Sequence, residues 1–265
     1  MLVDSHAHLD LPEFNDDREG VIKRAKENGV GCILTVGINL ESCRDAIKLA
    51  DSYDFVYASI GIHPHDSKDI KKGTYAVLRS LASNKKILAY GEIGLDFYRN
   101  LTPRDIQIKR FREQINLACE LNLPIIIHCR DAHKETLGIL REEKTDNLGG
   151  IIHCFSGDYS FAKNCIDMGF HISIPGTVTF PRAVELHDVV KRLPLSNMLI
   201  ETDCPFLTPV PYRGKRNEPM FVKYVAERIA TLKGIQQEEV AEITSQNFST
   251  LFNLHRNFLS VDHPE

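Results

Sequence analysis

Short apolar runs rich in β-branched residues alternate along this chain with longer amphipathic segments. Eight such runs recur about every 28 residues, and polar residues follow almost every one. They cover residues 2–5, 31–36, 56–60, 87–91, 124–127, 150–152, 171–174 and 198–200. The period fits one strand plus one helix, and strict alternation of the two predicts a parallel sheet.

Segments with helical periodicity separate the runs, at residues 18–28, 40–52, 74–83, 103–121, 134–142, 159–168, 182–193 and 220–233. Eight strand–helix units in a chain of this length predict a single-domain α/β fold, a (β/α)8 TIM barrel. An open doubly wound sheet is the alternative, but no GxGxxG or GxxxxGK[ST] loop follows any predicted strand. We expect residues 1–255 to form the barrel, extra C-terminal helices over residues 236–254 to cap one end, and residues 256–265 to form a tail.

Charge and cysteine content limit the partners of the chain. A net charge of −4 gives no global attraction to nucleic acid or to an anionic membrane, so either partner would need a local basic patch. Seven scattered cysteines predict reduced thiols rather than a disulfide framework. The N-terminus lacks the pattern of a secretory signal, and no apolar run approaches about 18 residues. We therefore expect a cytoplasmic monomer with no membrane partner and no obligate protein partner.

Histidine or carboxylate residues follow five of the predicted strands. In a barrel these strand ends meet at one rim, where active sites lie. The residues are His6, His8, Glu92, His128, His153 and Asp203. Singly, each could be a buried histidine satisfied by carbonyl groups or a helix cap. Together, four nitrogen and two carboxylate ligands are too many for one four-coordinate ion, so they predict two metal ions roughly 3.5–4 Å apart.

Six motifs resemble those of the TatD family of metal-dependent deoxyribonucleases, which belongs to the amidohydrolase-type barrels. They are HAHLD (6–10), GIHPHD (61–66), GEIGLDFY (91–98), IIHCRDA (126–132), HCFSGD (153–158) and LIETDCPFLTPVPYRGKRNEP (199–219). The resemblance implies that His6, His8 and Asp203 hold one metal ion, that His128 and His153 hold the other, and that Glu92 bridges the two. Related amidohydrolases commonly have a carboxylated lysine where this chain has Glu92.

The resemblance implies hydrolysis of phosphodiester bonds in DNA by a 3′–5′ exonuclease acting on single-stranded or frayed 3′ ends, with RNA as a further candidate substrate. A hydroxide bridging the metals would attack phosphorus, with Glu92 and Asp203 as the catalytic residues and Asp203 as the base. Glu201 faces the same way as Asp203 and is expected to orient a ligand. The resemblance points to two Mg²⁺ ions, whereas four histidines by themselves favour Zn²⁺ or another late transition metal; Mn²⁺ is also a candidate.

Further polar residues on the same rim are candidates for substrate contact. His63, His65 and Arg130 could bind a phosphate; packing or helix capping is the alternative for the histidines, and a salt bridge to Asp131 or Asp158 is the alternative for Arg130. Asp96, Phe97 and Tyr98 could line the groove; packing against the rim is the alternative for Phe97 and Tyr98.

The loop after the eighth predicted strand combines three cations with an aromatic ring. Arg213, Lys215 and Arg216 suit backbone phosphates, and Tyr212 could stack on a base. A solvated charged surface is the alternative.

Other functions could use the same metal ligands. An aminoacyl-tRNA deacylase or a small-molecule amidohydrolase or lactonase would keep the site and change the substrate. A small apolar amide or lactone would not need the cationic loop at residues 213–216. A non-enzymatic nucleic-acid-binding module would explain that loop but leave six converging ligands without a purpose.

Overall fold

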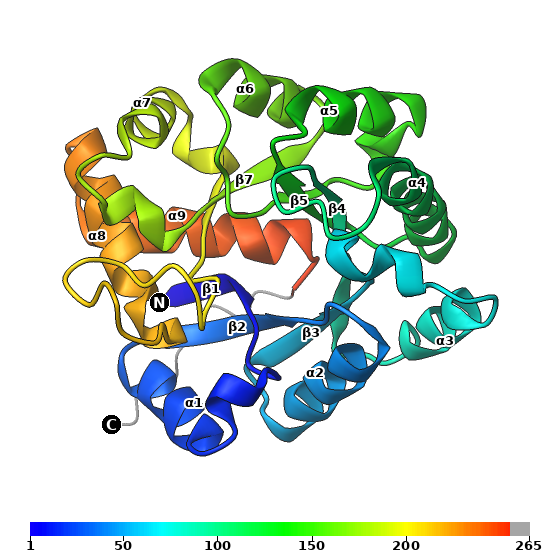
Figure 1. The fold of residues 1–265 in the computed structure, drawn as a ribbon. Coiled ribbons are helices and arrows are strands. Elements are labelled where there is room, and N and C mark those ends of the chain that lie inside the picture. The colour runs from blue at the N-terminus through cyan, green and yellow to red at the C-terminus, as the bar shows by residue number, and fades with distance from the viewer. Residues whose placement is uncertain (255–265) are drawn as a thin grey trace.

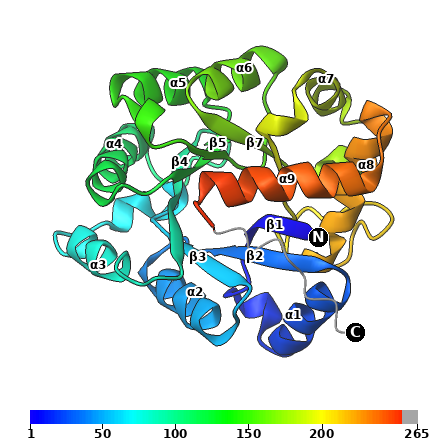
Figure 2. The same cartoon turned by 180° about the vertical axis from the view of Figure 1, so that it is seen from behind.

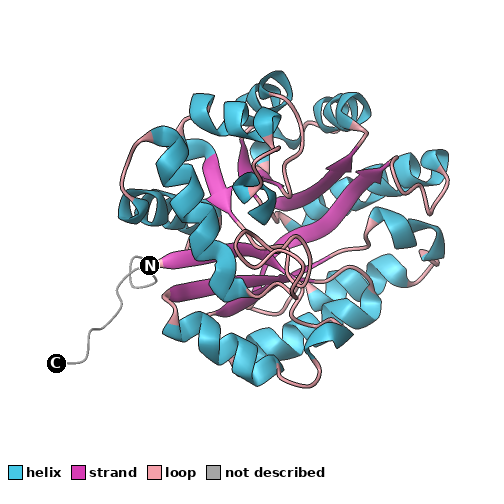
Figure 3. Ribbon diagram, turned by 60° about the vertical axis from the view of Figure 1, so that its left-hand side comes forward, coloured by secondary structure: helices cyan, strands magenta, loops and turns pink. Residues whose placement is uncertain are grey.

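The computed structural model describes residues 1–254 and shows eight parallel strands, each paired with the next along the chain. The strands form the central sheet in Figure 3. They are β1 (Leu2–Ala7), β2 (Val30–Val36), β3 (Val56–Ile60), β4 (Ile87–Asp96), β5 (Ile125–Arg130), β6 (Gly150–Ile152), β7 (Phe170–Ile174) and β8 (Met198–Ile200). The predicted order and direction of the strands are confirmed.

Helices surround this sheet, as Figure 1 shows. They are α1 (Arg18–Glu27), α2 (Leu40–Ser52), α3 (Thr74–Leu81), α4 (Arg104–Leu121), α5 (His133–Glu142), α6 (Tyr159–Asp167), α7 (Val184–Arg192), α8 (Val222–Lys233) and α9 (Gln237–Leu251). Their buried faces pack on the strands through one continuous apolar core. None of the helices within residues 1–254 has both the length and the apolar character needed to cross a membrane.

The barrel is closed between β1 and the segment that follows β8. The backbone N–H of Asp203 donates to the carbonyl of His6 (2.9 Å), and that of His8 donates to the carbonyl of Cys204 (2.8 Å). Buried Asp4 strengthens this junction, because its carboxylate accepts hydrogen bonds from the backbone N–H (2.9 Å) and the hydroxyl (2.6 Å) of Thr202. Closure therefore places the candidate ligands of the first and last strands side by side.

Helix α9 covers the end of the barrel opposite the candidate ligands and crosses the front of the view in Figure 2. Phe248 and Phe252 belong to a second core cluster with side chains from the barrel interior. The interior members of the cluster are Val3, Cys32, Leu34, Val36, Ala89, Ile126, Ile151 and Leu199. The Asn247 side-chain amide also donates to the carbonyl of Met198 (2.8 Å). Of the one or two capping helices predicted, the structure has one; the predicted tail at 256–265 lies outside the described residues.

Strands β1, β4 and β5 extend farther than their apolar runs predicted. The prediction ended β4 at Gly91, but the strand continues to Asp96 and pairs with β5 as far as Arg130. Gly94 allows this continuation: its φ is +142°, and a Cβ there would lie 2.0 Å from the carbonyl oxygen of His128. The added residues interrupt the apolar runs with polar side chains such as Glu92 and Asp96, which are buried, and this is why apolar runs alone placed the ends too early.

The packing of α9 can be tested with Phe248→Ala. This change removes a fully buried ring and leaves a cavity at the closed end of the barrel, so we expect a loss of about 3–5 kcal/mol in the free energy of unfolding. Val184→Ala on α7, where the side chain is 70% exposed, is expected to change it by less than about 0.5 kcal/mol. Urea denaturation of the three proteins measures both values; equal midpoints would contradict the proposed contribution of α9.

Candidate metal centre

The six predicted metal ligands converge at the carboxyl ends of the strands. His6 and His8 come from the end of β1, Glu92 from β4 and His128 from β5. His153 follows β6, and Asp203 follows β8. Five of the six are buried and His128 is partly buried.

Glu92 lies between two groups of histidines, and each of its oxygens faces one group. Its Oε2 lies 3.4 Å from the Nε2 of His6 and 3.7 Å from the Nε2 of His8. Its Oε1 lies 2.6 Å from the Nδ1 of His128 and 2.9 Å from the Nε2 of His153. A carboxylate placed in this way can bind one cation with each oxygen.

The first group consists of His6, His8 and Asp203. The Nε2 atoms of the two histidines are 3.2 Å apart, and Oδ1 of Asp203 lies 3.4 Å from Nε2 of His8. His8 donates from Nδ1 to the carbonyl of Val36 (3.0 Å), so its neutral form has a lone pair on Nε2. Lone pairs of nitrogen and oxygen therefore point at one another, an arrangement that needs a shared proton or a metal ion between them.

The second group, His128 and His153, has a carboxylate behind each ring. His128 donates from Nε2 to Oδ2 of Asp96 (3.1 Å), which leaves the lone pair on Nδ1 facing Glu92. Nδ1 of His153 lies 3.4 Å from Oε1 of Glu201, and its Nε2 faces Glu92. The hydrogen bond from the far nitrogen of His128 to Asp96 is the arrangement that orients metal-binding histidines.

Electrostatics in this cluster favour ionised carboxylates. Burial alone would raise the pKa of the Glu92 carboxyl, but the His153 and His63 rings and the hydrogen bond to His128 hold it well below its usual range. Burial alone would lower the pKa of His8, but the Asp203 and Glu92 carboxylates raise it to about 9. The site therefore attracts positive charge, whether as protons on the rings or as metal ions.

Several overlapping groups of these residues could hold a metal ion. Two three-residue groups have potential ligand atoms within 4.8 Å of one another, His6–His8–Asp203 and His63–Glu92–His128, and a third combines His6, His153 and Glu201. Within residues 1–254 no lysine or arginine forms an ion pair with Glu92, Asp96, Glu201 or Asp203. Nδ1 of His6, Nδ1 of His153 and Oε2 of Glu201 are buried without hydrogen-bond partners. The cluster therefore relies on imidazoles or bound cations for its positive charge.

His63 and His65 lie beside these ligands. Nδ1 of His63 accepts the backbone N–H of His65 (3.1 Å), so in neutral His63 the proton is on Nε2, which lies 3.4 Å from Oε1 of Glu92. That tautomer makes His63 a hydrogen-bond donor to Glu92 rather than a metal ligand. His65 pairs through Nε2 with Oδ2 of Asp96 (2.9 Å) and is partly exposed. The predicted phosphate contacts of both residues remain proposals.

Arg130 does not form the salt bridge that we considered as the alternative to a phosphate contact. Its guanidinium carbon lies 4.1 Å from the centre of the Tyr98 ring, and Asp158 instead caps α6 through the N–H of Phe161. Both Arg130 and Tyr98 are exposed, whereas Asp96 and Phe97 are buried and do not line an open groove. Phe97 packs under Arg104, whose guanidinium carbon is 4.4 Å from the ring centre.

The cationic loop contains two kinds of positive charge. Arg213 lies over Phe180 (4.5 Å) and Lys215 lies over Tyr212 (5.6 Å), both exposed and without an acidic partner among residues 1–254. Arg216 instead forms hydrogen bonds with both carboxylate oxygens of Asp17 (2.8 Å each).

Two residues of this loop have partners within the protein. The charge of Arg216 is offset by Asp17 and by Glu218 (3.2 Å), and its predicted phosphate contact stays a prediction. Tyr212 stacks on Phe221 with the ring centres 4.6 Å apart and also contacts Tyr224; its predicted contact with a base stays a prediction.

Asp96 is a functional candidate that the sequence suggested only as a groove residue. Its Oδ2 accepts from both His65 and His128, and its Oδ1 accepts the backbone N–H of Arg99 (2.7 Å). Burial alone would raise its pKa, but the two histidine contacts hold it far below the usual range. The sequence does contain a signal for this role, because Asp96 follows Glu92 by four residues. Residues with this spacing lie on the same face of a strand, provided that the strand continues past Gly94.

We expect Asp96→Asn to weaken the affinity for divalent metal by about 10- to 100-fold, because His128 loses the carboxylate that fixes its ring. Asp69→Asn makes the same chemical change at an exposed aspartate in the loop after β3 and is the control. Calorimetric titration of metal-free protein with Mn²⁺ measures the affinity without recourse to activity. Equal affinities for both variants would show that Asp96 does not position a ligand.

Comparison with known proteins identifies the family. Residues 3–253 match the model of the family described as TatD related DNase. The chain is 48% identical over 255 residues to an uncharacterized metal-dependent hydrolase, YabD, of Bacillus subtilis, covering 96% of this chain and 100% of that protein. It is 36% identical over 260 residues to the 3′-5′ ssDNA/RNA exonuclease TatD of Salmonella typhimurium, covering 96% and 99%.

Solved structures agree with this match. The crystal structure of the TatD homologue YjjV from Escherichia coli superposes with a TM-score of 0.90 at 31% identity, over 96% of this chain and 98% of that one. An organophosphorus hydrolase from Deinococcus radiodurans shares the fold at 13% identity, with a TM-score of 0.61 over 95% and 92% of the two chains. The family predicted from the six motifs is confirmed: the chain belongs to the TatD-related DNase family of metal-dependent hydrolases.

Proposed function

We propose that this protein is a 3′–5′ exonuclease that hydrolyses phosphodiester bonds of single-stranded DNA or RNA with two bound metal ions. The observation that supports this most strongly is the position of Glu92, with one oxygen facing His6 and His8 and the other facing His128 and His153. The TatD exonucleases among the relatives support the choice of substrate and polarity.

In this proposal His6, His8 and Asp203 hold one ion, His128 and His153 hold the other, and Glu92 binds both. Two divalent ions, once bound, lower the pKa of a water molecule and offset the negative charge that develops on the phosphate. Mg²⁺ is the ion we propose, with Mn²⁺ and Zn²⁺ as alternatives to be distinguished by experiment.

Asp203 is the residue that we assign as the general base. Its side chain is 13% exposed, whereas those of Glu92, Asp96 and Glu201 are exposed by 3% or less. It is therefore the carboxylate of the site that incoming water and substrate can reach most readily. A base must lie within hydrogen-bond reach of the proton it removes, so this accessibility supports the assignment.

Arg130, Arg213 and Lys215 are the cations that we propose for contact with the sugar–phosphate backbone. Each is exposed, and each lies over an aromatic ring rather than beside a carboxylate. A cation without an acidic partner can neutralise a phosphate without first breaking an ion pair. We also propose a cytoplasmic location, which the seven free cysteines favour.

The test of the proposed function is digestion of single-stranded DNA labelled at its 5′ end. Metal-stripped protein is resupplied separately with Mg²⁺, Mn²⁺ or Zn²⁺, beside Glu92→Gln prepared in the same way. We expect a ladder shortened one nucleotide at a time from the 3′ end, only when metal is present. Glu92→Gln should lower the rate by at least about 100-fold, because residues that merely orient metal ligands already contribute 10- to 100-fold.

A circular dichroism melt of Glu92→Gln checks that this variant is folded. Undiminished cleavage by folded Glu92→Gln would contradict the role of Glu92. The absence of cleavage with every metal would contradict the nuclease and favour an aminoacyl-tRNA or a small-molecule ester or amide as the substrate of the same site.

The salt dependence of DNA binding tests the proposed phosphate contacts. For single strands, the plot of log K against log salt has a slope of about −0.7 per neutralised phosphate. The double variant Arg213→Gln/Lys215→Gln should therefore have a slope shallower by about 1.4. Lys26→Gln/Lys85→Gln removes two exposed cations at the α9 end of the barrel and should leave the slope unchanged. Equal slopes for the two double variants would place the backbone path elsewhere.

A further inference from the structure

Exposed apolar side chains gather in two loops beside the metal centre. Within residues 1–254 the large hydrophobic side chains that are exposed are Tyr98, Leu101, Val184, Phe206 and Val210. Four of the five lie in the loops after β4 and β8, at the end of the barrel where the metal ligands converge. Exposed apolar surface in a cluster is typical of a binding site, whereas isolated exposed residues are not.

Phe206 lies next to the first group of metal ligands. It is three residues beyond Asp203, and its ring centre is 6.3 Å from that of His8 in an edge-on contact. Its backbone is fixed on both sides, because its N–H donates to the carbonyl of Asp203 (2.9 Å) and its carbonyl accepts from buried Asn217 (2.6 Å). The side chain is nevertheless 48% exposed. A rigid backbone thus holds an aromatic ring toward solvent beside the site.

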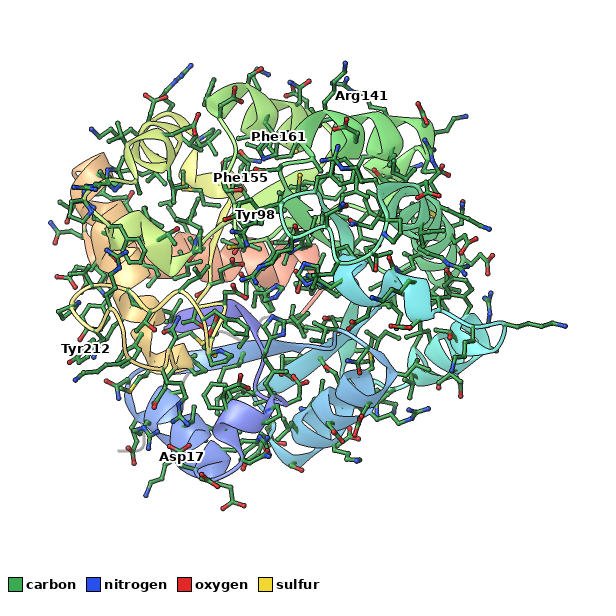
Figure 4. All side chains as sticks on the ribbon, in the orientation of Figure 1. Asp17, Tyr98, Arg141, Phe155, Phe161 and Tyr212 are labelled. Carbon is green, nitrogen blue, oxygen red and sulfur yellow. The ribbon has the colours of Figure 1, made fainter. Side chains whose placement is uncertain are left out.

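Tyr98 lies on the side of the second group of candidate ligands, His128 and His153, as Phe206 lies beside the first. It is two residues beyond Asp96, which holds His128, and its ring is 62% exposed. Arg130, two residues beyond His128, lies over one face of this ring at 4.1 Å, and the N–H of Phe97 donates to the carbonyl of Arg130 (2.9 Å). Figure 4 shows Tyr98 near the middle of the barrel opening, whereas Tyr212 lies at its margin.

We propose that Phe206 and the Tyr98–Arg130 pair are base-stacking positions for the last nucleotides of a single strand whose 3′ end is in the metal centre. This rests on the proposed function. An aromatic ring stacks on any nucleobase without reading its sequence, and an adjacent arginine adds a cation–π contact and a charge for the phosphate. Bases paired in a duplex are not free to stack on these rings, so the two positions select unpaired ends.

The nucleobase is the occupant that this chemistry favours over a peptide or a lipid. The two rings flank ligands suited to a phosphodiester. Arg130 at the end of β5 and Arg213 and Lys215 in the loop after β8 are exposed cations at the same end of the barrel. Planar rings beside unpaired cations match a chain of alternating bases and phosphates.

The test compares two 5′-fluorescein decathymidylates whose 3′-terminal linkages are phosphorothioates, which slow cleavage. One carries all its bases and the other lacks the three at its 3′ end. Fluorescence anisotropy with Mg²⁺-loaded protein gives the dissociation constants. We expect Phe206→Ala and Tyr98→Ala each to weaken binding of the base-containing strand by about 5- to 150-fold and to leave binding of the abasic strand nearly unchanged. Phe206→Trp and Tyr98→Phe should retain tight binding.

Phe206→Leu keeps an apolar side chain without an aromatic face and should behave like Phe206→Ala, whereas Val184→Ala on α7 should behave like the unmodified protein. Equal weakening for both strands would show a structural role for the rings, and no weakening would show no role; either result overturns the proposal.

Cleavage of the same strands with ordinary phosphodiester linkages separates this proposal from the proposed function. Base-dependent binding that the alanine variants lose, without cleavage by the unmodified protein, would support the stacking positions and contradict the exonuclease. Cleavage that neither alanine variant changes, with unchanged binding, would support the exonuclease and contradict the stacking positions. The absence of both cleavage and base-dependent binding would overturn the exonuclease and the stacking positions together.

Discussion

The cost of burying the Glu92 carboxylate shapes the open end of this barrel. Glu92 is 3% exposed, and within residues 1–254 no lysine or arginine pairs with it. Its two oxygens instead face imidazole rings from β1, the loop after β3, β5 and the segment after β6. An isolated buried carboxylate is strongly unfavourable, so Glu92 depends on hydrogen bonds and on positive charge from these rings or from bound cations. Two metal ions would supply that charge and, at the same time, a site for hydrolysis.

The fold supports this arrangement through buried polar contacts that reach one layer beyond the ligands. Asp4 and Thr202 close the barrel and bring His6 beside Asp203. Behind the second group, Asp96 and Glu201 face the far nitrogens of His128 and His153. At the opposite end, Phe248 and Phe252 of α9 fill the interior with apolar side chains. One end of the barrel is therefore an apolar core, and the other concentrates charge around a small volume.

The sequence predicted the barrel and the convergence of six candidate ligands because both follow from local signals, namely a regular strand–helix period and a histidine or carboxylate at the ends of five strands. It did not predict the partners of Arg216, since Asp17 lies 199 positions away and the pairing exists only after closure. Nor did it show that Tyr212 packs on Phe221 while Phe206 stays exposed, because all three belong to one loop and its folding decides which ring faces solvent. The role of Asp96 was hidden because the predicted strand ended at Gly91, whereas β4 continues to Asp96.

The proposed position of Glu92 between two metal ions can be tested directly. Crystals of the unmodified protein soaked in Mn²⁺ and measured at the manganese absorption edge give the anomalous signal of each ion. We expect two separate peaks, one in contact with Glu92 Oε2 and the His6–His8–Asp203 group, the other in contact with Glu92 Oε1 and the His128–His153 group. A single peak, or two peaks of which one does not touch Glu92, would contradict the proposed position.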